Sequence, residues 1–340
     1  MNTGAIVLDV MGCDLGLMQA IDGAMLALSN PDIMIKKIFL VGQENEIRKH
    51  PSIATYETNN RLEVVHAQSI ITTEESPTLA IKNKKDSSIV VGLNLIKDGL
   101  ADAFVSAGST GAVLTAATLI VGRIKGIKRP ALATVIPSAK GYYLLIDCGA
   151  NMDAKPEYIL QFAKMGSVYV QELLDISRPR VGLINVGAEK EKGNALTKEA
   201  YTLLEAAHAE GLINFVGNTE GRSMPLGDID VAVCDAFVGN VLLKYAEGFG
   251  KGILSIIKEE LMADPISKVG ALLSKPAYKR VRSHFDYKEV GGAPFLGLNA
   301  LVVKAHGSSD SKAFFGAIRQ ANRFIVTDIV SKIKQKVIND

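Results

Sequence analysis

The sequence predicts an α/β fold with three layers, αβα, around a mostly parallel sheet from which a helical hairpin protrudes. Three observations support this prediction. Short apolar runs alternate with segments of helical periodicity along almost the whole chain. Within these runs the apolar residues are nearly continuous, as in strands that helices cover on both faces. Five apolar runs end in short stretches of small and polar residues that lead into a helical segment, within residues 103–112, 144–151, 183–194, 232–240 and 301–310.

Each predicted strand is a short run of β-branched and aliphatic residues. In chain order these runs cover residues 5–9, 38–42, 62–66, 131–136, 143–147, 181–186, 213–216, 231–234 and 300–304. Helical periodicity covers residues 18–28 and 87–97. Pro156 suits the first turn of a helix that extends to about Asp175, and Gly211 suits the end of a helix that follows Asn194.

Composition favours a single globular unit and gives no reason to expect nucleic acid as a partner. The 340 residues include 38 basic and 36 acidic side chains, a net charge of +2, and no linker or low-complexity tract divides them. We therefore expect one entwined unit over residues 1–340. Cys13, Cys148 and Cys234 are odd in number and far apart, which argues against a disulfide framework and favours a cytoplasmic protein.

Residues 250–285 depart from this pattern and predict two helices joined at Asp264 and Pro265. Between residues 265 and 285 the sequence has no acidic residue. Its basic residues there are Lys268, Lys275, Lys279, Arg280 and Arg282. Two interpretations remain open. Either the hairpin packs in a core or against a second copy with its basic face in solvent, or that face contacts anionic lipid or an acidic protein.

The five loops that follow apolar runs form the candidate binding site. In a parallel sheet we expect such loops along one edge, where backbone N–H groups and helix N-termini attract anions. Five of them predict a polar site assembled around a phosphate-like group. Each loop alone is also compatible with a tight turn or a helix cap. The candidate residues are Ser106, Gly108, Ser109, Thr110, Gly111, Asp147, Asn151, Lys155, Lys192, Gly193, Asn194, Asp235, Asn240, Lys304, His306, Ser308 and Ser309.

Other chemistries lack their sequence motifs. The chain has no Walker loop, no glycine fingerprint for dinucleotides after a strand, no CxxC pair, no HExxH and no G-x-S-x-G. We therefore expect neither a metal nor a cofactor. His306 is the one histidine on the five loops, and it lies between Lys304 and two serines at a predicted helix start. This setting suits a ligand-binding or proton-carrying histidine.

Several long segments carry a family resemblance, in order along the chain. They include DAFVSAGSTGA, LLIDCGANMDAKPEYILQFAKMGSVY, RPRVGLINVGAEKEKGN, VCDAFVGNVLLK and DYKEVGGAPFLGLNALVVKAHGSSD. Nearly end to end, the chain resembles the PlsX family, the phosphate:acyl-[acyl-carrier-protein] acyltransferases of bacterial phospholipid synthesis. The resemblance implies transfer of a long-chain acyl group from acyl-[acyl-carrier-protein] to inorganic phosphate, which gives acyl phosphate. It also implies a fold akin to phosphotransacetylases and isocitrate-dehydrogenase-like enzymes.

The partners that the resemblance implies are a second copy of the chain, the acyl carrier protein and an anionic membrane surface. The protein would be a cytoplasmic homodimer that associates peripherally with the membrane. A membrane glycerol-3-phosphate acyltransferase would then receive the acyl phosphate. Acyl carrier proteins are acidic, so they and anionic lipid are the two expected partners of the basic hairpin.

The resemblance and the loop chemistry together give a hypothesis for the site. Residues 106–111, residues 192–194 and the serines after His306 would bind phosphate. Lys304 or His306 would stabilise the oxyanion or protonate the departing thiolate. Asp147, Asn151 and Asp235 would orient these donors. The catalytic candidates are His306, Lys304, Lys192 and Asp235.

The chain departs from the family pattern at a few positions. After the motif that runs from Asp9 to Asp14, the usual proline is missing. Ser109 stands where Asn is usual, Ala236 where Gly is usual, and Ala188 where an acidic residue is common. Two alternatives stay open. One is an enzyme of the phosphotransacetylase type that uses acyl-coenzyme A, and the other is a non-catalytic phosphate-binding scaffold at the membrane.

Overall fold

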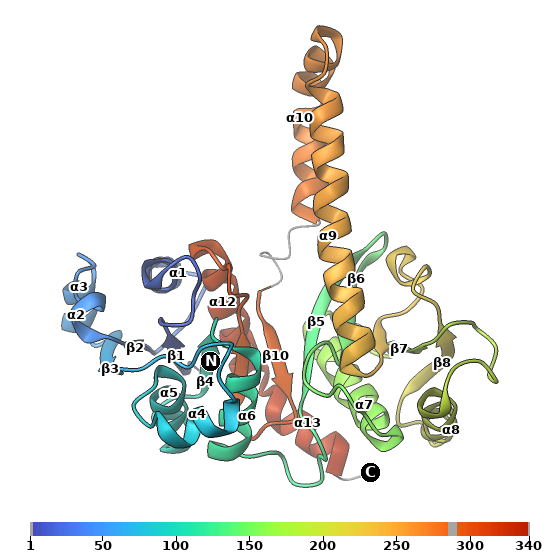
Figure 1. The fold of residues 1–340 in the computed structure, drawn as a ribbon, viewed down its shortest axis with the longest axis horizontal. Helices are drawn as coiled ribbons and strands as arrows, with labels where there is room; N and C mark the ends of the chain where they lie inside the picture. The colour runs from blue at the N-terminus through green and yellow to red at the C-terminus, as the bar shows by residue number, and fades with distance from the viewer. Residues whose placement is uncertain (1–2, 285–290, 339–340) are drawn as a thin grey trace.

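One sheet of eleven strands runs through residues 3–284 and 291–338, the part of the chain that this computed structural model describes (Figure 1). Its order is β3-β2-β1-β4-β11-β10-β5-β6-β9-β7-β8. The strands are β1 (Ala5–Asp9), β2 (Lys37–Gly42), β3 (Leu62–His66), β4 (Ala103–Ser106), β5 (Ala131–Ser138), β6 (Gly141–Ile146), β7 (Arg180–Ile184), β8 (Asn214–Thr219), β9 (Val231–Val233), β10 (Ala293–Leu296) and β11 (Leu301–Lys304). Every predicted run lies on one of them. The prediction missed β10, because Pro294 is unusual inside a strand.

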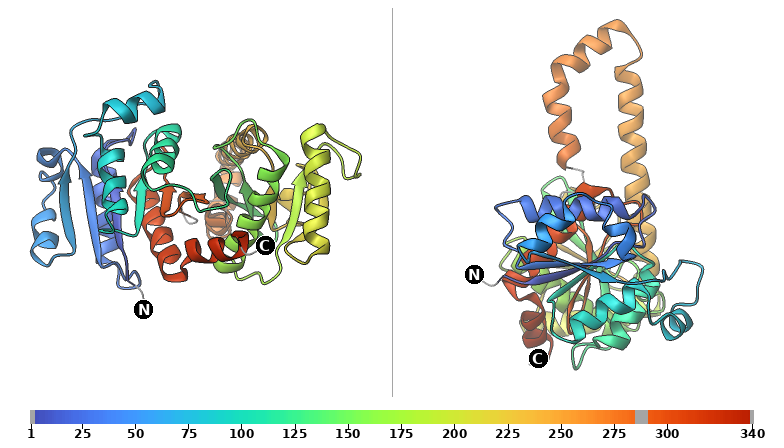
Figure 2. Two further views of the ribbon diagram at one scale, coloured as in Figure 1. Left: turned by 90° about the horizontal axis from the view of Figure 1, so that it is seen from below. Right: turned by 90° about the vertical axis from the view of Figure 1, so that its left-hand side faces the viewer.

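Helices cover both faces of the sheet, as the predicted three-layer fold requires (Figure 2). In the described residues they are α1 (Leu17–Ser29), α2 (Glu44–Ile47), α3 (Ile53–Thr58), α4 (Pro77–Asn83), α5 (Ser88–Lys97), α6 (Thr110–Ile120), α7 (Pro156–Leu173), α8 (Ala195–Ala209), α9 (Ala236–Leu261), α10 (Pro265–His284), α12 (Ser311–Thr327) and α13 (Ile329–Ile338). Helices α1 and α12 pack together over one face of β1 and β4, and α5 covers the other. A short 3₁₀ turn, η1 (Met224–Leu226), precedes β9.

The core lies between these layers. The side chains of Val7, Phe104 and Val302, on the neighbouring strands β1, β4 and β11, are fully buried. This is what the continuous apolar runs of the sequence predict, because a strand between two helical layers has no solvent face. Pro156 begins α7 as expected, and Gly211 follows α8 with a positive φ of 77°.

Strands β10 and β5 divide the sheet into halves of opposite strand direction. Strands β1, β2, β3, β4 and β11 run parallel to one another, and so do β6, β7, β8 and β9. Between the halves, β10 pairs antiparallel with β11 and β5, and β5 pairs antiparallel with β6. The two sets of strands therefore run in opposite directions, and their carboxyl ends meet near the middle of the sheet. Ile146 of β6 pairs with Ala133 of β5, and Val303 of β11 pairs with Pro294 of β10, on either side of the pair between Leu132 and Phe295.

The five loops therefore do not follow strands of one direction, as expected for a parallel sheet, but form two groups. We call residues 9–14, 106–111 and 304–310 the first loop group, because they follow β1, β4 and β11. Residues 147–155, 185–194 and 234–240 follow β6, β7 and β9 and are called the second loop group. Strand direction was the missing information, since an apolar run has the same pattern in either direction.

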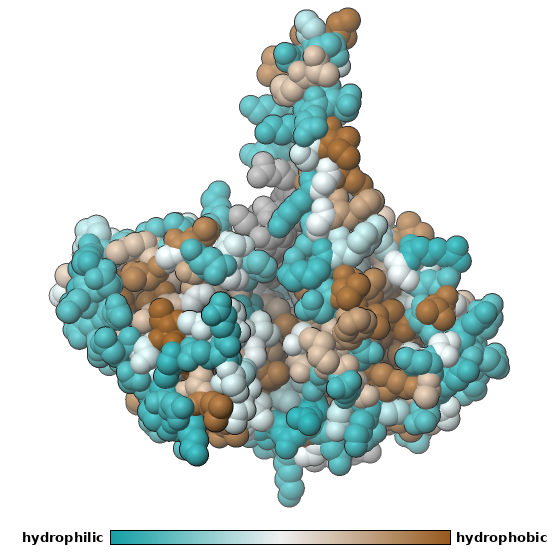
Figure 3. All heavy atoms as spheres, viewed as in Figure 1, coloured by the Kyte–Doolittle hydropathy of each residue, from teal (hydrophilic) through white to brown (hydrophobic). Residues whose placement is uncertain are grey.

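Helices α9 and α10 form an arm that projects from the body (Figures 1 and 2). Helix α9 begins at Ala236 rather than near residue 250, so one helix of 26 residues joins the second loop group to the arm. Large apolar side chains are exposed on both helices, and Figure 3 shows them along the arm and at its tip. The most exposed are Ile266, Leu272 and Leu273. The interpretation that the hairpin packs in a core of this chain is therefore wrong.

The predicted basic residues of the hairpin lie on α10. Lys268, Lys275, Lys279 and Arg280 are exposed, whereas the side chain of Arg282 and the last predicted residue, Phe285, lie outside the described part of the chain. Among the described residues, no helix is long and apolar enough to cross a membrane.

Candidate functional site

The first loop group begins with three polar side chains at adjacent strand ends. Asp9 of β1 is in register with Ser106 of β4, and Ser106 is in register with Lys304 of β11. Equivalent positions on parallel strands point to the same face of a sheet. The carboxylate, the hydroxyl and the ammonium group therefore form one row, which we call the strand-end row.

Hydrogen bonds fix the buried part of this row. The Ser106 hydroxyl donates to Asp9 Oδ2 at 2.7 Å and accepts from the Gly108 N–H at 3.0 Å, and the Met11 N–H donates to Asp9 Oδ1 at 3.0 Å. Asp9 is 1% exposed and Ser106 is 0% exposed. Burial raises the pKa of Asp9, and the hydrogen bonds from Ser106 and Met11 oppose this rise. Because its proton is already donated, Ser106 shapes the loop and does not present a donor to a ligand.

The Lys304 ammonium group is held against backbone carbonyls of the first loop group. Its Nζ donates to Ala107 O at 3.0 Å and also to Ala305 O. Burial lowers the pKa of Lys304 to about 8, and the charge of Asp9 works against this shift. An ammonium group has three N–H donors, so the two carbonyls leave one for a ligand. Near pH 7 Lys304 is mostly charged, as an anion-binding group must be.

His306 adds a neutral imidazole to the same group. The Ser308 N–H donates to His306 Nδ1 at 3.2 Å, and the Ser308 hydroxyl lies 2.8 Å from the same atom. Partial burial lowers the pKa of His306, and the positive charge of Lys244 lowers it further. With Nδ1 accepting, the ring proton is on Nε2. Since His306 is exposed, this N–H is available to donate to a substrate.

The loops of the first group pack directly on one another. The Asp14 N–H donates to Gly307 O at 2.9 Å, which joins the loop after β1 to the loop after β11. A Cβ atom on Gly12 would lie 2.5 Å from Gly108 Cα, so only glycine allows the loops after β1 and β4 to approach this closely. Segments that are far apart in sequence therefore form one continuous surface.

Helix α6 begins at this surface and adds backbone donors. Ser109 caps the helix, because its Oγ accepts the Ala112 N–H at 3.5 Å. Ser109 and Thr110 are half-buried and Gly111 is exposed, whereas Ser309 of the neighbouring loop is buried. The N–H groups at a helix start favour an anion. The first loop group therefore offers a helix start, a cation and an imidazole N–H within one surface.

In the second loop group, the carboxylate of Asp147 is saturated by its own chain. It accepts hydrogen bonds of 2.7–3.1 Å from the backbone N–H groups of Leu132, Gly149, Ala150 and Asn151 and from the Asn151 side chain. Asp147 is fully buried. Burial raises its pKa, and these hydrogen bonds oppose the rise. Asp147 and Asn151 therefore hold the loop after β6 in shape.

Other candidates of the second loop group lie at helix starts. Asn194 caps α8 by accepting the Thr197 N–H at 2.9 Å, and Asp235 caps α9 by accepting the Val238 N–H at 2.9 Å. Lys155 and Lys192 are exposed. The capping alternative thus applies to Asn194 and Asp235. Contact between phosphate and any residue of this group stays a prediction.

Gly193 shows why the loop after β7 needs glycine at this position. Its φ is 95°, in the left-handed region, and an added Cβ would lie 2.1 Å from Thr197 Oγ1. The same position lets the Asn185 side chain donate to Lys192 O at 3.0 Å. The glycine therefore serves the shape of the loop whether or not phosphate binds there.

One face of α9 connects the two loop groups. Asn240 Nδ2 donates to Cys148 O at 3.2 Å, in the second group. Lys244 follows one helical turn later on the same face and pairs with Glu247 at 3.0 Å. The charges of Lys244 and Glu247 both act on the pKa of His306, in the first group. This face of α9 therefore extends from one loop group to the other.

The sequence-based search missed two residues of this region. Asp9 ends the first apolar run and is followed by Gly12 and Asp14, so the signal that identified the other five loops was present there as well. Lys244 had no signal, because it lies inside a helical pattern and is brought to the site by the path of α9.

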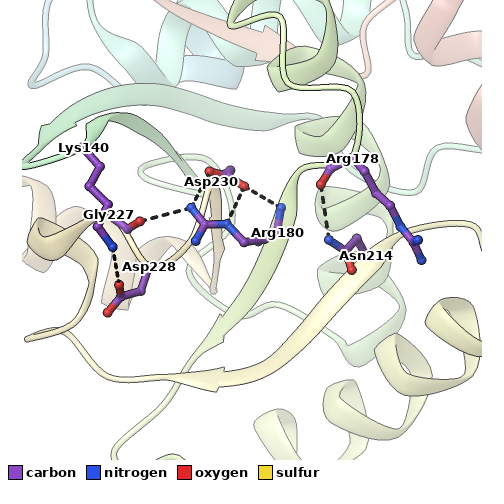
Figure 4. Close-up of polar contacts among 7 residues, drawn as sticks. All are labelled: Lys140, Arg178, Arg180, Asn214, Gly227, Asp228 and Asp230. Atoms are coloured by element: carbon purple, nitrogen blue, oxygen red, sulfur yellow. Dashed lines mark hydrogen bonds and ion pairs between the residues drawn. The ribbon is translucent and has the colours of Figure 1, made fainter.

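A charged cluster at the other ends of β7 and β9 is structural (Figure 4). Arg180 donates to both carboxylate oxygens of Asp230, from Nε at 3.0 Å and from Nη2 at 2.9 Å, and Nη2 also donates to Gly227 O at 3.1 Å. Burial would raise the pKa of Asp230, but the hydrogen bonds and charge of Arg180 hold it below its ordinary value. Beside this pair lies an exposed ion pair, in which Lys140 Nζ is 3.2 Å from Asp228 Oδ1. Arg180 begins β7 and Asp230 precedes β9. The ion pair therefore holds these two strands together at the ends that lie away from the second loop group.

Metal ligands do not gather at either loop group. Within residues 3–284 and 291–338, no cluster of three or more His, Cys, Asp or Glu side chains could hold a metal ion. Cys13, Cys148 and Cys234 are free thiols. What the first loop group provides is a set of fixed N–H donors and a cation, which can bind one oxyanion and stabilise a second that forms during a reaction.

Comparisons with known proteins extend this description. The family model described as "Fatty acid synthesis protein" matches residues 5–332. Over 333 residues the chain is 47% identical to "Phosphate acyltransferase" of Clostridium perfringens (strain SM101 / Type A), a match that covers 98% of this chain and 96% of the relative. It is 48% identical over 332 residues to "Phosphate acyltransferase" of Clostridium botulinum (strain Alaska E43 / Type E3), with 97% and 98% covered.

Solved structures show a similar fold at low sequence identity. A phosphotransacetylase from Streptococcus pyogenes superposes with a TM-score of 0.62 at 16% identity, over 95% of this chain and 94% of the other. The EutD phosphotransacetylase from Staphylococcus aureus gives a TM-score of 0.59 at 16% identity, with the same coverage. These likenesses confirm the prediction of a phosphotransacetylase-like α/β fold.

Proposed function

The chain belongs to the family of fatty acid synthesis proteins whose curated relatives are phosphate acyltransferases, and from this premise we propose that it transfers an acyl group from acyl-[acyl-carrier-protein] to inorganic phosphate. The products are acyl phosphate and the free carrier-protein thiol, and the acyl phosphate supplies phospholipid synthesis. The observation that carries the proposal is the Lys304 ammonium group, which has one N–H left for a ligand beside the start of α6.

Phosphate binds at the first loop group in this proposal. The backbone N–H groups at the start of α6, around Thr110 and Gly111, and the Lys304 ammonium group neutralise its charge. Ser308 adds a hydroxyl beside His306. Phosphate is already a nucleophile, so its oxygen attacks the thioester carbonyl carbon directly.

The tetrahedral intermediate then carries a negative charge on the former carbonyl oxygen. The Nε2–H of His306 or the remaining N–H of Lys304 stabilises that charge. When the intermediate collapses, the carbon–sulfur bond breaks, the acyl–oxygen bond remains, and the thiolate leaves with the carrier protein. A proton from Lys304, whose pKa of about 8 is close to that of a thiol, can neutralise the leaving group.

The second loop group and α9 complete this proposal from the other half of the sheet. Lys192 and the N–H groups at the start of α8 form the proposed second contact, either for inorganic phosphate or for a phosphate group carried by the acyl donor. Lys244 lies between the two groups and adds a cation to both. Asp147 and Asp235 hold the loops that carry these groups.

The arm is the proposed docking surface for larger partners. The exposed cations of α10 include Lys275, Lys279 and Arg280, and they suit an acidic carrier protein or an anionic membrane surface. The exposed apolar side chains of α9, which include Phe237, Tyr245 and Phe249, suit a second copy of the chain. We therefore propose a homodimer that associates peripherally with the membrane and passes acyl phosphate to a glycerol-3-phosphate acyltransferase there.

Release of the carrier-protein thiol tests the reaction. Purified protein is incubated with long-chain acyl-[acyl-carrier-protein], with and without inorganic phosphate, and the free thiol is measured. We expect release that depends on phosphate and that Lys304→Met lowers by about 100- to 1,000-fold. Faster release from acyl-coenzyme A would favour an enzyme of the phosphotransacetylase type. No phosphate-dependent release from either donor would leave the scaffold alternative.

Vesicle binding tests the arm. Reversing Lys275, Lys279 and Arg280 to Glu should weaken binding to vesicles with anionic lipid at low salt, since each surface cation contributes about 1 kcal/mol at best. Vesicles of zwitterionic lipid serve as the control. Unchanged binding of the triple variant would remove the lipid-facing role of α10.

A further inference from the structure

We propose that Asp9 is a positioning residue for Lys304 and acts on it through Ser106 and the peptide group between Ala107 and Gly108. The inference rests on the proposed function, in which Lys304 binds phosphate and the forming oxyanion. Asp9 lies at the end of β1, behind the loop that the substrate would contact, and it is 1% exposed. It therefore acts on the reaction only through its neighbours.

A continuous path of hydrogen bonds leads from Asp9 to Lys304. Asp9 Oδ2 accepts the Ser106 hydroxyl at 2.7 Å, and the Ser106 oxygen in turn accepts the Gly108 N–H at 3.0 Å. The carbonyl of the same peptide group, Ala107 O, accepts from Lys304 Nζ at 3.0 Å. One peptide group is therefore bound at both ends, by the serine on one side and by the lysine on the other.

The sheet makes this path rigid. Asp9, Ser106 and Lys304 occupy the same register on three adjacent parallel strands, so the distances between their backbones are set by the ladder itself. Asp9 also accepts the Met11 N–H at 3.0 Å, which ties its second oxygen to the loop after β1. Because both oxygens of the carboxylate are held by hydrogen bonds, Asp9 restrains the orientation of the Ser106 hydroxyl.

Charge gives Asp9 a second effect on the same lysine. Burial lowers the pKa of Lys304 to about 8; Asp9, Asp14 and Cys13 of β1 and its loop oppose this, and Lys244 of α9 adds to it. Asp9 itself is faced by Ser106, by Met11 N–H and by the Ser88 hydroxyl of α5. Asp9 is the buried acid in this set, so its charge is screened least by water. Without that charge, Lys304 would lose its proton at a lower pH.

A second carboxylate that bonds to β1 separates positioning from simple support. Asp102 Oδ2 accepts the Ala5 N–H at 2.8 Å at the opposite end of β1. Asp9 and Asp102 thus both hold β1 through a hydrogen bond, but only Asp9 belongs to the path to Lys304. Asp102→Asn keeps a hydrogen-bond acceptor and is the control for Asp9→Asn.

The experiment is the pH profile of kcat/KM for phosphate in folded Asp9→Asn, Asp102→Asn and wild-type protein. The wild-type value should fall as pH rises through about 8, where Lys304 loses its charge. In Asp9→Asn we expect at least a tenfold lower value at pH 7.5 and a descending limb about one pH unit lower, as for loss of a nearby opposite charge. Asp102→Asn should retain the wild-type limb. Ionisation of phosphate is the same in all three, so their ratio reports the protein.

Two further variants keep the test decisive. Ser106→Ala leaves the charge of Asp9 but breaks the path, so it should lower kcat/KM and leave the limb near its wild-type pH. In a Lys304→Met background, Asp9→Asn should cause no additional loss, because both changes act through one group. If Asp9→Asn does not fold, Ser106→Ala replaces it in the same comparison. Its loss of kcat/KM is measured alone and in the Lys304→Met background, where we expect no additional loss.

The outcomes separate this inference from the proposed function. An active wild-type protein whose limb does not move in Asp9→Asn, or whose losses add fully to those of Lys304→Met, would overturn the role of Asp9 alone. A wild-type protein without phosphate-dependent thiol release would overturn the proposed function, on which the inference depends.

Discussion

The two loop groups carry the same sequence signal but differ in what their polar atoms bind. In the first group, Lys304 has an N–H left for a ligand, and the exposed His306 accepts at Nδ1, which leaves its proton on Nε2. In the second group, the Asp147 carboxylate is filled by hydrogen bonds from its own chain, and Asp235 caps α9. A loop of glycine and polar residues after a strand therefore indicates a place for function. The number of uncommitted donors decides whether a ligand can bind there.

The same comparison assigns different consequences to mutations in the two groups. Changes at Lys304 and His306 should alter catalysis and leave the fold intact, since these residues lie at the carboxyl end of β11 and in the loop that follows it. Changes in the second group should act first on stability where a buried carboxylate is involved. Four predictions follow from this difference in bonding, in order of decreasing size.

Lys304→Met should have the largest effect. It removes the cation that the proposed mechanism places at phosphate and at the oxyanion, and loss of one such donor costs about 3–4 kcal/mol of transition-state stabilisation. We expect kcat/KM to fall by about 100- to 1,000-fold with little change in the melting temperature. Steady-state kinetics and thermal unfolding measure the two quantities. Lys82→Met, on the exposed surface of α4, is the control, and an active Lys304→Met would remove the first group from the mechanism.

Asp147→Ala should affect stability more than chemistry. The change leaves several buried N–H groups without an acceptor, so we expect the free energy of unfolding to fall by about 3 kcal/mol. Urea denaturation measures this loss. The fraction that remains folded should turn over at a rate within a few-fold of wild type. A stable but inactive Asp147→Ala would show that this residue takes part in the reaction directly.

His306→Ala and Lys192→Ala compare the groups directly. The site hypothesis predicts that each lowers turnover more than tenfold with the fold retained, because each removes a donor to phosphate or to the oxyanion. Lys190→Ala is the matched control for the loop after β7, since Lys190 pairs with Glu205 at the surface. Normal turnover in Lys192→Ala together with a large loss in His306→Ala would confine the site to the first loop group.

Lys244→Ala should produce the smallest change, and its sign is opposite to that of Asp9→Asn. The positive charge of Lys244 helps to lower the pKa of Lys304 and His306, so its removal should raise both. The descending limb of the pH profile should then move up by less than about one pH unit, as for loss of a partly exposed like charge. Lys258→Ala, further along α9, is the control. A limb that moves down would contradict the placement of Lys244 beside Lys304.

The sequence by itself determined the local structure. Continuous apolar runs predicted the strands, and proline and glycine placed the ends of α7 and α8, because burial and backbone preference act within a few residues. The same reasoning predicted loops rich in glycine and polar residues, and it placed Lys304 and His306 in them. It missed β10, where Pro294 weakened the signal, and it began the arm too late on α9.

Only the tertiary structure decided which residues meet. Strand direction splits the five loops into two groups, and an apolar run carries no mark of its direction. Register places Asp9 beside Ser106 and Lys304, although 97 residues separate the first two. Hydrogen bonds from its own chain then occupy the carboxylate oxygens of Asp147, whereas Lys304 keeps one N–H donor for a ligand. These outcomes depend on contacts between distant segments, and such contacts exist only once the chain has folded.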